Sequence, residues 1–301
     1  MLDFLLKLSE PMNISGSEDD LVATISAFFP QEHFSVRYTQ GNSLIVQRRE
    51  AFSESRKLLI TTSVDTVGFL ALFCDSAKAY LSLTANEELG EIKGETLLSS
   101  KGKEYVLCCE KNDTDSFFVK GKNIPLGEAF RFQPEFSTEK DLIAGRFVSC
   151  YALISVLMNL KALVSEYNVA LSFCTFGNAG SFQEAIVSKL VKPDFVICLG
   201  TMQSEEKSVI LLKKDGKQFS DRLFSSLVQT IAKKSQILLS EQISEQKISP
   251  IDSVCGAHSA KVLSLALPCR NKNLKNESVF QKSLQDLTDL LRAVSTEIFT
   301  E

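Results

Sequence analysis

The chain has 301 residues, of which 44% are hydrophobic and 23% are charged, and its formal net charge is −4. This composition is typical of a globular chain long enough for one large domain or two smaller ones. The acidic balance excludes a basic stripe that would displace counterions from phosphates, so we expect no nucleic-acid partner. No apolar run approaches the ~20 residues that span a bilayer, and no signal peptide is recognisable, so we expect no membrane partner.

The cysteines indicate the cellular compartment, and the small number of histidines limits the metal sites that the chain can form. The eight cysteines lie in apolar stretches such as VLCC and SFCTF and form no Cys-x-x-Cys pair. This pattern favours buried, reduced thiols and a cytoplasmic location. The two histidines, His33 and His258, are few for a metal centre, because zinc-like ions prefer imidazole and thiolate ligands.

The first 66 residues contain helical and strand patterns. Residues 2–29 are predicted to form a helix broken by the turn PMNISGSEDD, with Ser17 and Asp20 as a capping box for the second part. FSVRY and SLIVQRR then predict a hairpin around the turn QGN. KLLITTSVD predicts a buried strand that ends in polar residues.

Residues 67–143 differ in character, because short apolar strands recur there with little helical periodicity. The strands are predicted over GFLALFC, AYLSL, YVLCCE, SFFVK and EAFRFQP. Such spacing predicts a small all-β module. Most of its aromatic residues, in SFFV (116–119) and FRF (130–132), are expected in its core, and an exposed subset would form a dimer surface.

From residue 144 onward, helices and strands alternate. A helix is predicted over 147–164, and the strands VALSFCTFG, DFVICLG and LALPC alternate with helices. The last helix carries an apolar stripe at Phe280, Leu284, Leu287, Leu291 and Val294. This order predicts an α/β sandwich with a mixed or parallel sheet, formed by residues 1–66 and 144–301, with residues 67–143 inserted as a β domain.

Eight segments, taken in order, carry a family resemblance: LLKLSEPMNISGSED, QGNSLIV, LLITTSVDTVGFL, IPLGEAFRF, LIAGRFVSCYALISVL, FCTFGNAGSFQEA, FVICLGT and LALPCRNKN. Together they resemble the tetrahedral-aminopeptidase family of cocatalytic metallopeptidases, which includes glutamyl aminopeptidases and proteins long labelled endoglucanase M. The resemblance implies a hydrolase-like α/β sandwich with a barrel-like insertion used for dimerisation, and therefore a homo-oligomer, a dimer or larger.

The resemblance also shows where the family's metal ligands and base should stand. Such a centre needs imidazole or carboxylate ligands and a nearby carboxylate base. The matching positions here are Ser63 for the first His, Ala144 and Gly145 for the Asp-Asp pair, Gly177 and Asn178 for the Glu-Glu pair, Gly200 for an Asp, and Asn273 for the last His. Asp65, which would orient the first His, is kept. We therefore expect no catalytic residue, no metal and no other cofactor, because serine, alanine, glycine and asparagine replace the ligands.

Other candidate residues favour structural roles. Cys255 and His258 are spaced as a possible nucleophile pair, but the segment is better interpreted as a small core thiol beside a helix-start histidine. His33 is expected in a loop or at a strand entry. Glu87 and Glu88 are expected on a solvated turn.

Three functional hypotheses remain open. The first is a catalytically inactive member of the fold that acts through self-association or binding of another protein. The second is a polar pocket in the vacated cleft, lined by Ser63, Asp65, Asn178, Asn273 and Arg270, that binds a small ligand or a peptide end. The third is a metal-dependent aminopeptidase-like hydrolase with the unconventional ligands Asp65, Asp141 and His258.

Overall fold

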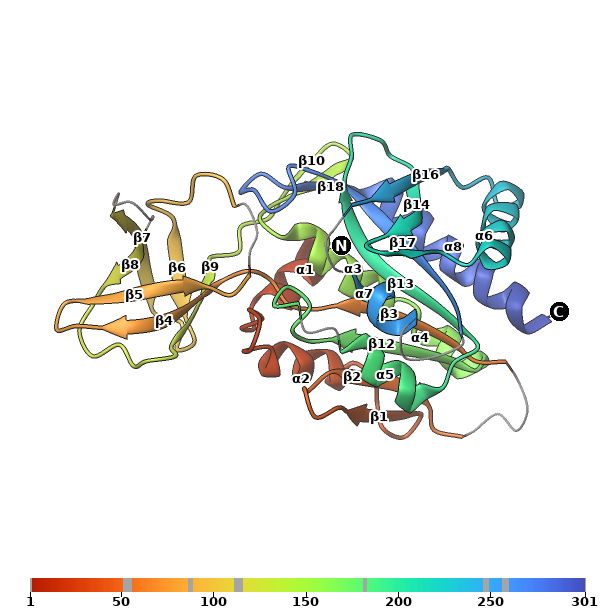
Figure 1. The fold of residues 1–301 in the computed structure, drawn as a ribbon, viewed down its shortest axis with the longest axis horizontal. Coiled ribbons are helices and arrows are strands. Elements are labelled where there is room, and N and C mark those ends of the chain that lie inside the picture. Colours follow the sequence, from red (N-terminus) through yellow and green to blue (C-terminus); the bar gives the residue numbers. More distant parts are fainter. Residues whose placement is uncertain are drawn as a thin grey trace.

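A large mixed sheet forms the centre of the molecule, and a separate β-barrel stands at one end of it (Figure 1). The computed structural model describes residues 2–50, 56–85, 89–110, 116–180, 183–245, 249–255 and 260–300. Within them, the sheet has 12 strands, with the central path β1-β2-β12-β3-β13-β17-β18-β11-β10 and β14, β15 and β16 beyond β17. The predicted α/β class with an inserted barrel-like domain is confirmed.

The strands of the large sheet are β1 (Phe34–Tyr38), β2 (Leu44–Arg48), β3 (Leu58–Ser63), β10 (Ser137–Glu139), β11 (Leu142–Ala144), β12 (Val169–Cys174), β13 (Phe195–Gln203), β14 (Val209–Asp215), β15 (Gln218–Phe219), β16 (Leu239–Ser244), β17 (Lys261–Arg270) and β18 (Ser278–Phe280). Strands β12, β3, β13 and β17 are parallel neighbours. All six residues of β12 are buried, as expected of a parallel strand covered on both faces.

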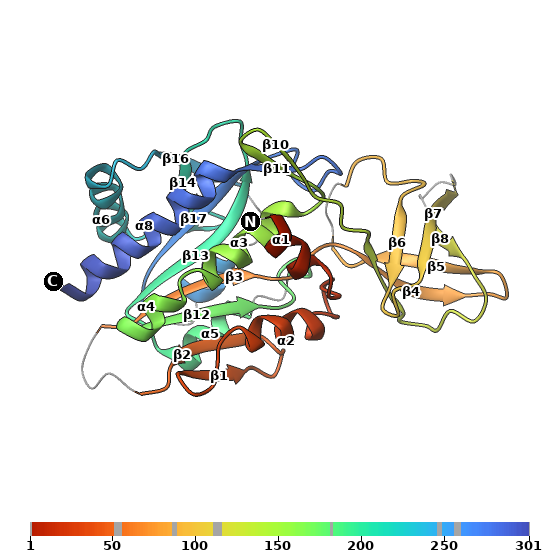
Figure 2. The same ribbon diagram turned by 180° about the vertical axis from the view of Figure 1, so that it is seen from behind.

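Helices cover both faces of this sheet, as the two opposite views show (Figures 1 and 2). They are α1 (Leu2–Ser9), α2 (Asp19–Ala27), α3 (Val148–Met158), α4 (Lys161–Glu166), α5 (Glu184–Val191), α6 (Arg222–Lys234), α7 (Pro250–Cys255) and α8 (Gln281–Thr300). Helices α3 and α8 pack on one face in the main hydrophobic core. Helices α5 and α7 cover the other face, over a smaller core that includes Ile45, Val187 and Val262.

The barrel is closed by β4 (Phe69–Cys74), β5 (Lys78–Leu83), β8 (Ser116–Lys120), β7 (Glu104–Glu110), β6 (Thr96–Ser99) and β9 (Ala129–Phe132), in that order. Phe69 and Phe130 fill its interior and are fully buried. Strand β10 lies within the predicted insertion 67–143 and β11 crosses its end, yet β10 pairs with β11, and β11 pairs with β18 of the large sheet. The barrel itself therefore occupies a narrower range than the predicted insertion, whose limits remain a prediction.

One local prediction is wrong, and a second is refined by the structure. The second helix begins at Asp19 with Glu18 as its N-cap residue, and no side chain caps it, so Ser17 and Asp20 form no capping box. The Glu18 carboxylate instead accepts N–H groups of Gly16 and Phe176. The single helix predicted over 147–164 is divided into α3 and α4 at Asn159 and Leu160.

The helical run Val148–Glu166 is long and apolar enough to cross a membrane, with a mean hydropathy of 1.6. The expectation that no apolar run approaches that length is therefore corrected. In the structure 72% of its most apolar window is buried within the protein. A helix that is hydrophobic all round is typical of the core of a large domain, and α3 contacts β3, β13, β17 and β18.

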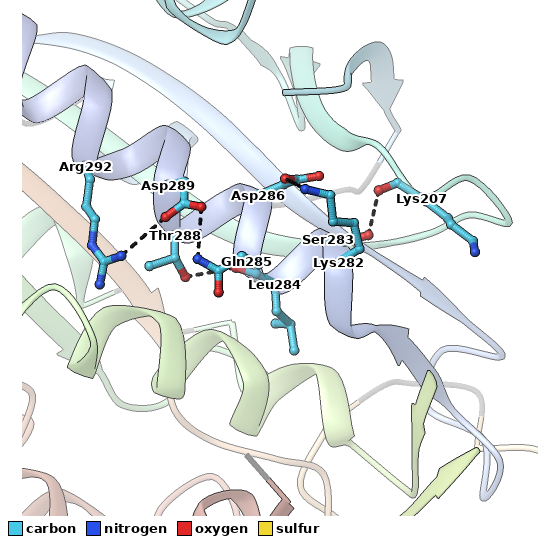
Figure 3. Close-up of polar contacts among 9 residues, drawn as sticks. All are labelled: Lys207, Lys282, Ser283, Leu284, Gln285, Asp286, Thr288, Asp289 and Arg292. Carbon is cyan, nitrogen blue, oxygen red and sulfur yellow. Dashed lines mark hydrogen bonds and ion pairs between the residues drawn. The ribbon is translucent and has the colours of Figure 1, made fainter. Parts of the chain in front are cut away.

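The C-terminal helix α8 buries Leu284, Leu287, Leu291 and Val294 of the predicted apolar stripe. The first residue of that stripe, Phe280, is instead the last residue of strand β18, so the helix begins after it. Figure 3 shows polar contacts that α8 makes within itself and with Lys207. Lys282 and Asp286 form an i,i+4 ion pair at 2.6 Å. The Ser283 hydroxyl donates to the Lys207 carbonyl at 2.6 Å, which joins the first turn of α8 to the segment before β14.

Candidate functional site

A cleft of about 740 Å³ lies at the carboxyl ends of β3, β12 and β13. Parallel strands end at the same edge of a sheet, so the polar segments that follow them meet there. Six of the predicted positions line the cleft: Ser63, Asp65, Gly177, Asn178, Gly200 and Asn273. Leu83, Thr84 and Ala85, at the end of β5, line its barrel side.

The other two predicted positions, Ala144 and Gly145, are not among the lining residues. Ala144 pairs with Ser278 at the end of β11. The Gly145 N–H donates to the Glu277 carbonyl at 2.8 Å, and a Cβ on Gly145 would lie 2.2 Å from the Phe136 ring. The Phe136 ring therefore fills the space that a side chain at position 145 would need.

Asp65 is buried where it lines the cleft, and neighbouring groups donate hydrogen bonds to both of its carboxylate oxygens. Oδ1 accepts the Gly177 N–H at 2.9 Å, and Oδ2 accepts the Asn178 N–H at 2.7 Å and the Ser15 hydroxyl. The Asn178 side chain donates to the Asp65 carbonyl at 2.7 Å. Burial raises the pKa of Asp65, and these donors oppose the rise by favouring its charged form.

Backbone geometry creates this arrangement. Phe176 has a left-handed conformation with φ 59°. Its N–H donates to Glu18 Oε1 at 2.8 Å, and the next two N–H groups donate to Asp65. Three successive amides thus face two carboxylates, in the manner of a backbone anion nest.

Gly177 leaves no room for the side chain that the family pattern expects there. A Cβ on Gly177 would lie 2.2 Å from Ser63 Oγ and 3.1 Å from Asp65 Oδ1. We call the group Ser63, Asp65, Gly177 and Asn178 the closed half of the cleft, because protein atoms fill it.

Two glutamates that we did not predict lie behind the closed half. Glu184 is fully buried; its Oε1 accepts the Ser63 hydroxyl at 3.5 Å, and Oε2 has no hydrogen-bond partner among the described residues. Burial, with the charge of Asp65, raises the pKa of Glu184 to about 7, and burial raises the pKa of Glu18 to about 7. A sequence signal existed for Glu184, because it shares the buried face of α5 with Val187, Ser188 and Val191.

The opposite side of the cleft is less filled. A Cβ on Gly200, in β13, would meet no atom within 4 Å. Lys272 lines the cleft beside it, and its Nζ donates to the Thr201 carbonyl at 3.4 Å. We call Gly200, Thr201, Lys272 and Asn273 the open half.

Glu277 and Arg146 both hydrogen-bond to the backbone of Asn273 in the open half. Glu277 accepts the Ser149 N–H at 2.8 Å and the Asn273 N–H at 2.6 Å, and thereby satisfies a donor in the first turn of α3. Burial raises the pKa of Glu277. Arg146 donates to the Asn273 carbonyl at 2.9 Å and pairs with Glu95 of the insertion at 2.5 Å.

The remaining candidates lie elsewhere. Asp141 is exposed and ion-paired with Lys207, and neither it nor Arg270 is among the residues that line the cleft; Arg270 pairs with Glu205 at 2.7 Å. Burial raises the pKa of Cys255, which disfavours its thiolate. His33 is exposed, and His258, Glu87 and Glu88 lie outside the described residues.

The donor set does not fit a dimetal pair. Within the described ranges, no three His, Cys, Asp or Glu residues are grouped so that they could hold a metal ion. Asp65 is the acid at the closed half, and its oxygens already face N–H and O–H protons, which a cation would have to displace. We therefore derive no catalytic step through a metal.

Comparison with known proteins agrees with this fold. No protein-family model and no curated protein matches the chain. An aminopeptidase of the archaeon Desulfurococcus kamchatkensis is similar in structure with a TM-score of 0.86 and 13% identity, over 97% of this chain and 93% of that chain. A TET aminopeptidase of a marine-sediment Thaumarchaeota archaeon is similar with a TM-score of 0.85 and 14% sequence identity, over 99% of this chain and 98% of that chain.

The TET1 peptidase of Pyrococcus horikoshii gives a TM-score of 0.83 and 16% identity, over 98% of each chain. The chain therefore has an aminopeptidase-like α/β fold with an inserted barrel. More narrowly, the chain has the fold of the TET aminopeptidases, as its sequence motifs predicted. At these identities the likeness establishes the fold.

Proposed function

We propose that this protein is a catalytically inactive protein with the TET aminopeptidase fold, which acts by associating with copies of itself or with another protein. The observation that carries the proposal is the closed half of the cleft. There, the backbone N–H groups of Gly177 and Asn178 donate to the Asp65 carboxylate, and Ser63 lies where a side chain at position 177 would be.

Association is proposed to use the barrel. Leu72, Phe73 and Leu126 are 71%, 58% and 70% exposed, and Leu126 precedes Gly127, whose N–H donates to Ala71 beside Leu72. We call these three residues the barrel patch. Clustered exposed apolar side chains are typical of interaction surfaces. The P. horikoshii TET1 peptidase assembles into a tetrahedron or a large octahedral shell, which supports an oligomer here.

The test of association is the mass in solution, measured by light scattering. We expect a dimer or larger species for the natural protein and a monomer for Leu72→Ser/Phe73→Ser. Phe219→Ser is the matched control, because Phe219 is 70% exposed on the α/β domain, and it should leave the mass unchanged. An unchanged mass in the barrel variant, or a monomeric natural protein, would contradict association through the barrel.

The test of inactivity is a peptidase assay with added zinc, cobalt or manganese, together with the metal content of the purified protein. We expect no turnover above the metal-only blank. Metal-dependent turnover that disappears in Asp65→Asn would support the hydrolase hypothesis. The position of Asp141 outside the cleft lining counts against that hypothesis, because Asp141 was one of its three ligands.

A second candidate function is binding of a small ligand in the cleft, and the open half favours it. Gly200 leaves unfilled space there, beside an ammonium group. We also propose a cytoplasmic location, on the ground of the eight free cysteines.

A further inference from the structure

Lys272 is a cation that the sequence comparison did not single out. It lies between Arg270 and Asn273 after β17, and its half-buried side chain lines the cleft. Its Nζ donates to the Thr201 carbonyl at 3.4 Å, and its backbone N–H donates to Gln203 Oε1 at 2.8 Å, so both ends of the residue are tied to β13.

Among the described residues, no carboxylate lies within ion-pair distance of this ammonium group. The acids that face the same cleft lie beyond that distance and have hydrogen-bond donors of their own. Burial raises the pKa of Glu277 and of Asp215, and the charge of Lys272 opposes the rise in both. Glu277 accepts the backbone N–H groups of Ser149 and Asn273, and Asp215 accepts the Ser264 hydroxyl at 2.9 Å. A half-buried ammonium is incompletely solvated, so an anion that reaches it gains a charge-assisted hydrogen bond.

The space next to Lys272 suits an organic ligand. No atom lies within 4 Å of a Cβ built on Gly200, and Leu199, Leu212 and Val67 contribute apolar lining. A ligand with a short apolar body and one terminal anion would therefore place its two parts against matching surfaces.

The acids that line the cleft disfavour a dianion more strongly than a singly charged anion. Asp65, Asp215 and Glu277 also line the cleft, so a dianion such as phosphate meets repulsion that one ammonium does not offset. The first N–H groups of α3 are not available to a phosphate, because Val148 donates to Gly145 O, and Ser149 donates to Glu277.

We propose that the open half binds the carboxylate of a small organic acid or a peptide C-terminus, with Lys272 as the group that receives the carboxylate. This inference deepens the cleft-binding candidate and does not depend on association through the barrel. The mass measurement and the binding measurement can therefore fail separately.

The test is calorimetric titration of the full chain with two pairs of probes: N-acetylleucine against its amide, and the tripeptide Ala-Leu-Ala against its C-terminal amide. We expect each carboxylate to bind at least ~10-fold more tightly than its amide, since a hydrogen bond to a charged group contributes about 1.5–3 kcal/mol. A preference for the tripeptide would identify a peptide end as the source of the carboxylate, and a preference for N-acetylleucine would identify a free acid.

Variants at position 272 test the assignment. Lys272→Met keeps the length of the side chain without its charge and should lose the preference for carboxylate, whereas Lys272→Arg should retain it. Lys275→Met is the matched control, because Lys275 is exposed three residues away and should bind as the natural protein does. Thermal melting of each variant verifies that it folds.

Three results would overturn the proposal: no binding of either carboxylate at millimolar concentration, equal binding of acid and amide, or an undiminished preference in Lys272→Met. Inorganic phosphate is the counter-probe. Phosphate that binds as tightly as the carboxylates, and that depends on Lys272, would overturn the assignment of a singly charged ligand.

Discussion

The two halves of the cleft differ in how far protein atoms fill them. In both, the residues that the family pattern expects as metal ligands are replaced by small or neutral ones. In the closed half, the N–H groups of Gly177 and Asn178 and the Ser15 hydroxyl donate to Asp65, and Ser63 fills the space beside Gly177. In the open half, Gly200 leaves space, and Lys272 provides a positive charge.

The difference follows from what each half retains. A buried carboxylate without a cation must find hydrogen-bond donors or bind a proton, because desolvation disfavours its charge. Asp65 finds the amides of the segment after β12, so that side closes. In the open half, Gly200 has no side chain, and the Glu277 carboxylate binds the Asn273 N–H, so the space at Gly200 is left unfilled.

Asp65→Ala should reduce the free energy of unfolding by about 3 kcal/mol. It leaves the N–H groups of Gly177 and Asn178 without acceptors, and an unsatisfied buried donor costs about 1–3 kcal/mol. Urea denaturation followed by circular dichroism measures the loss, with Asp3→Ala on the exposed side of α1 as the control. A loss below ~1 kcal/mol would show that the amides do not depend on Asp65.

Glu184→Gln should make the protein more stable at pH 8, by up to about 3 kcal/mol, and leave its stability unchanged near pH 4.5. The folded state raises the pKa of Glu184 from 4.5 to about 7, so it binds the proton more tightly than the unfolded chain does. Its contribution to stability is therefore complete below pH 4.5 and is lost as the pH rises through about 7.

The measurement is denaturation at a series of pH values, with Glu32→Gln, an exposed position, as the control. Glu18 retains a similar pH dependence in the variant, because its pKa is also raised to about 7. Equal stability of natural protein and Glu184→Gln at pH 8 would argue that Glu184 is not desolvated.

Gly177→Ala should cost about 1–3 kcal/mol, because its Cβ would overlap Ser63 and the packing must shift. Chemical denaturation measures this loss. The double variant Gly177→Ala/Ser63→Gly should recover much of it, since Ser63 supplies the overlapping atoms. A neutral Gly177→Ala would indicate that the closed half is not filled.

Gly200→Ala is the counterpart in the open half and should be neutral or stabilising by up to ~1 kcal/mol. The new Cβ meets no atom, and alanine restricts the unfolded chain more than glycine does. The same denaturation experiment applies. A loss comparable to that of Gly177→Ala would erase the contrast between the two halves.

Much of the architecture was predictable, because a long apolar pattern within one segment indicates which of its residues are buried. The hairpin β1–β2, the buried strands β3, β12 and β13 and the apolar stripe of α8 from Leu284 onward agree with the predicted elements, whereas Phe280 of that stripe belongs to β18. The short strands β6, β10 and β18 were not predicted, since three or four residues carry too little periodicity and depend on pairing with distant strands. The Ser17–Asp20 capping box failed because a distant amide, Phe176 N–H, engages the neighbouring Glu18.

The sequence by itself determined the order of elements and the absence of histidine and carboxylate at the positions that the family resemblance assigns to metal ligands. What surrounds these positions depends on the tertiary structure: Asp65 meets amides more than 110 residues away, Glu184 lies in the core beside Ser63, and Lys272 lines the same cleft as Gly200. The physical reason is that residue type is a local property of the chain. Desolvation, hydrogen-bond partners and free volume arise only when distant segments meet.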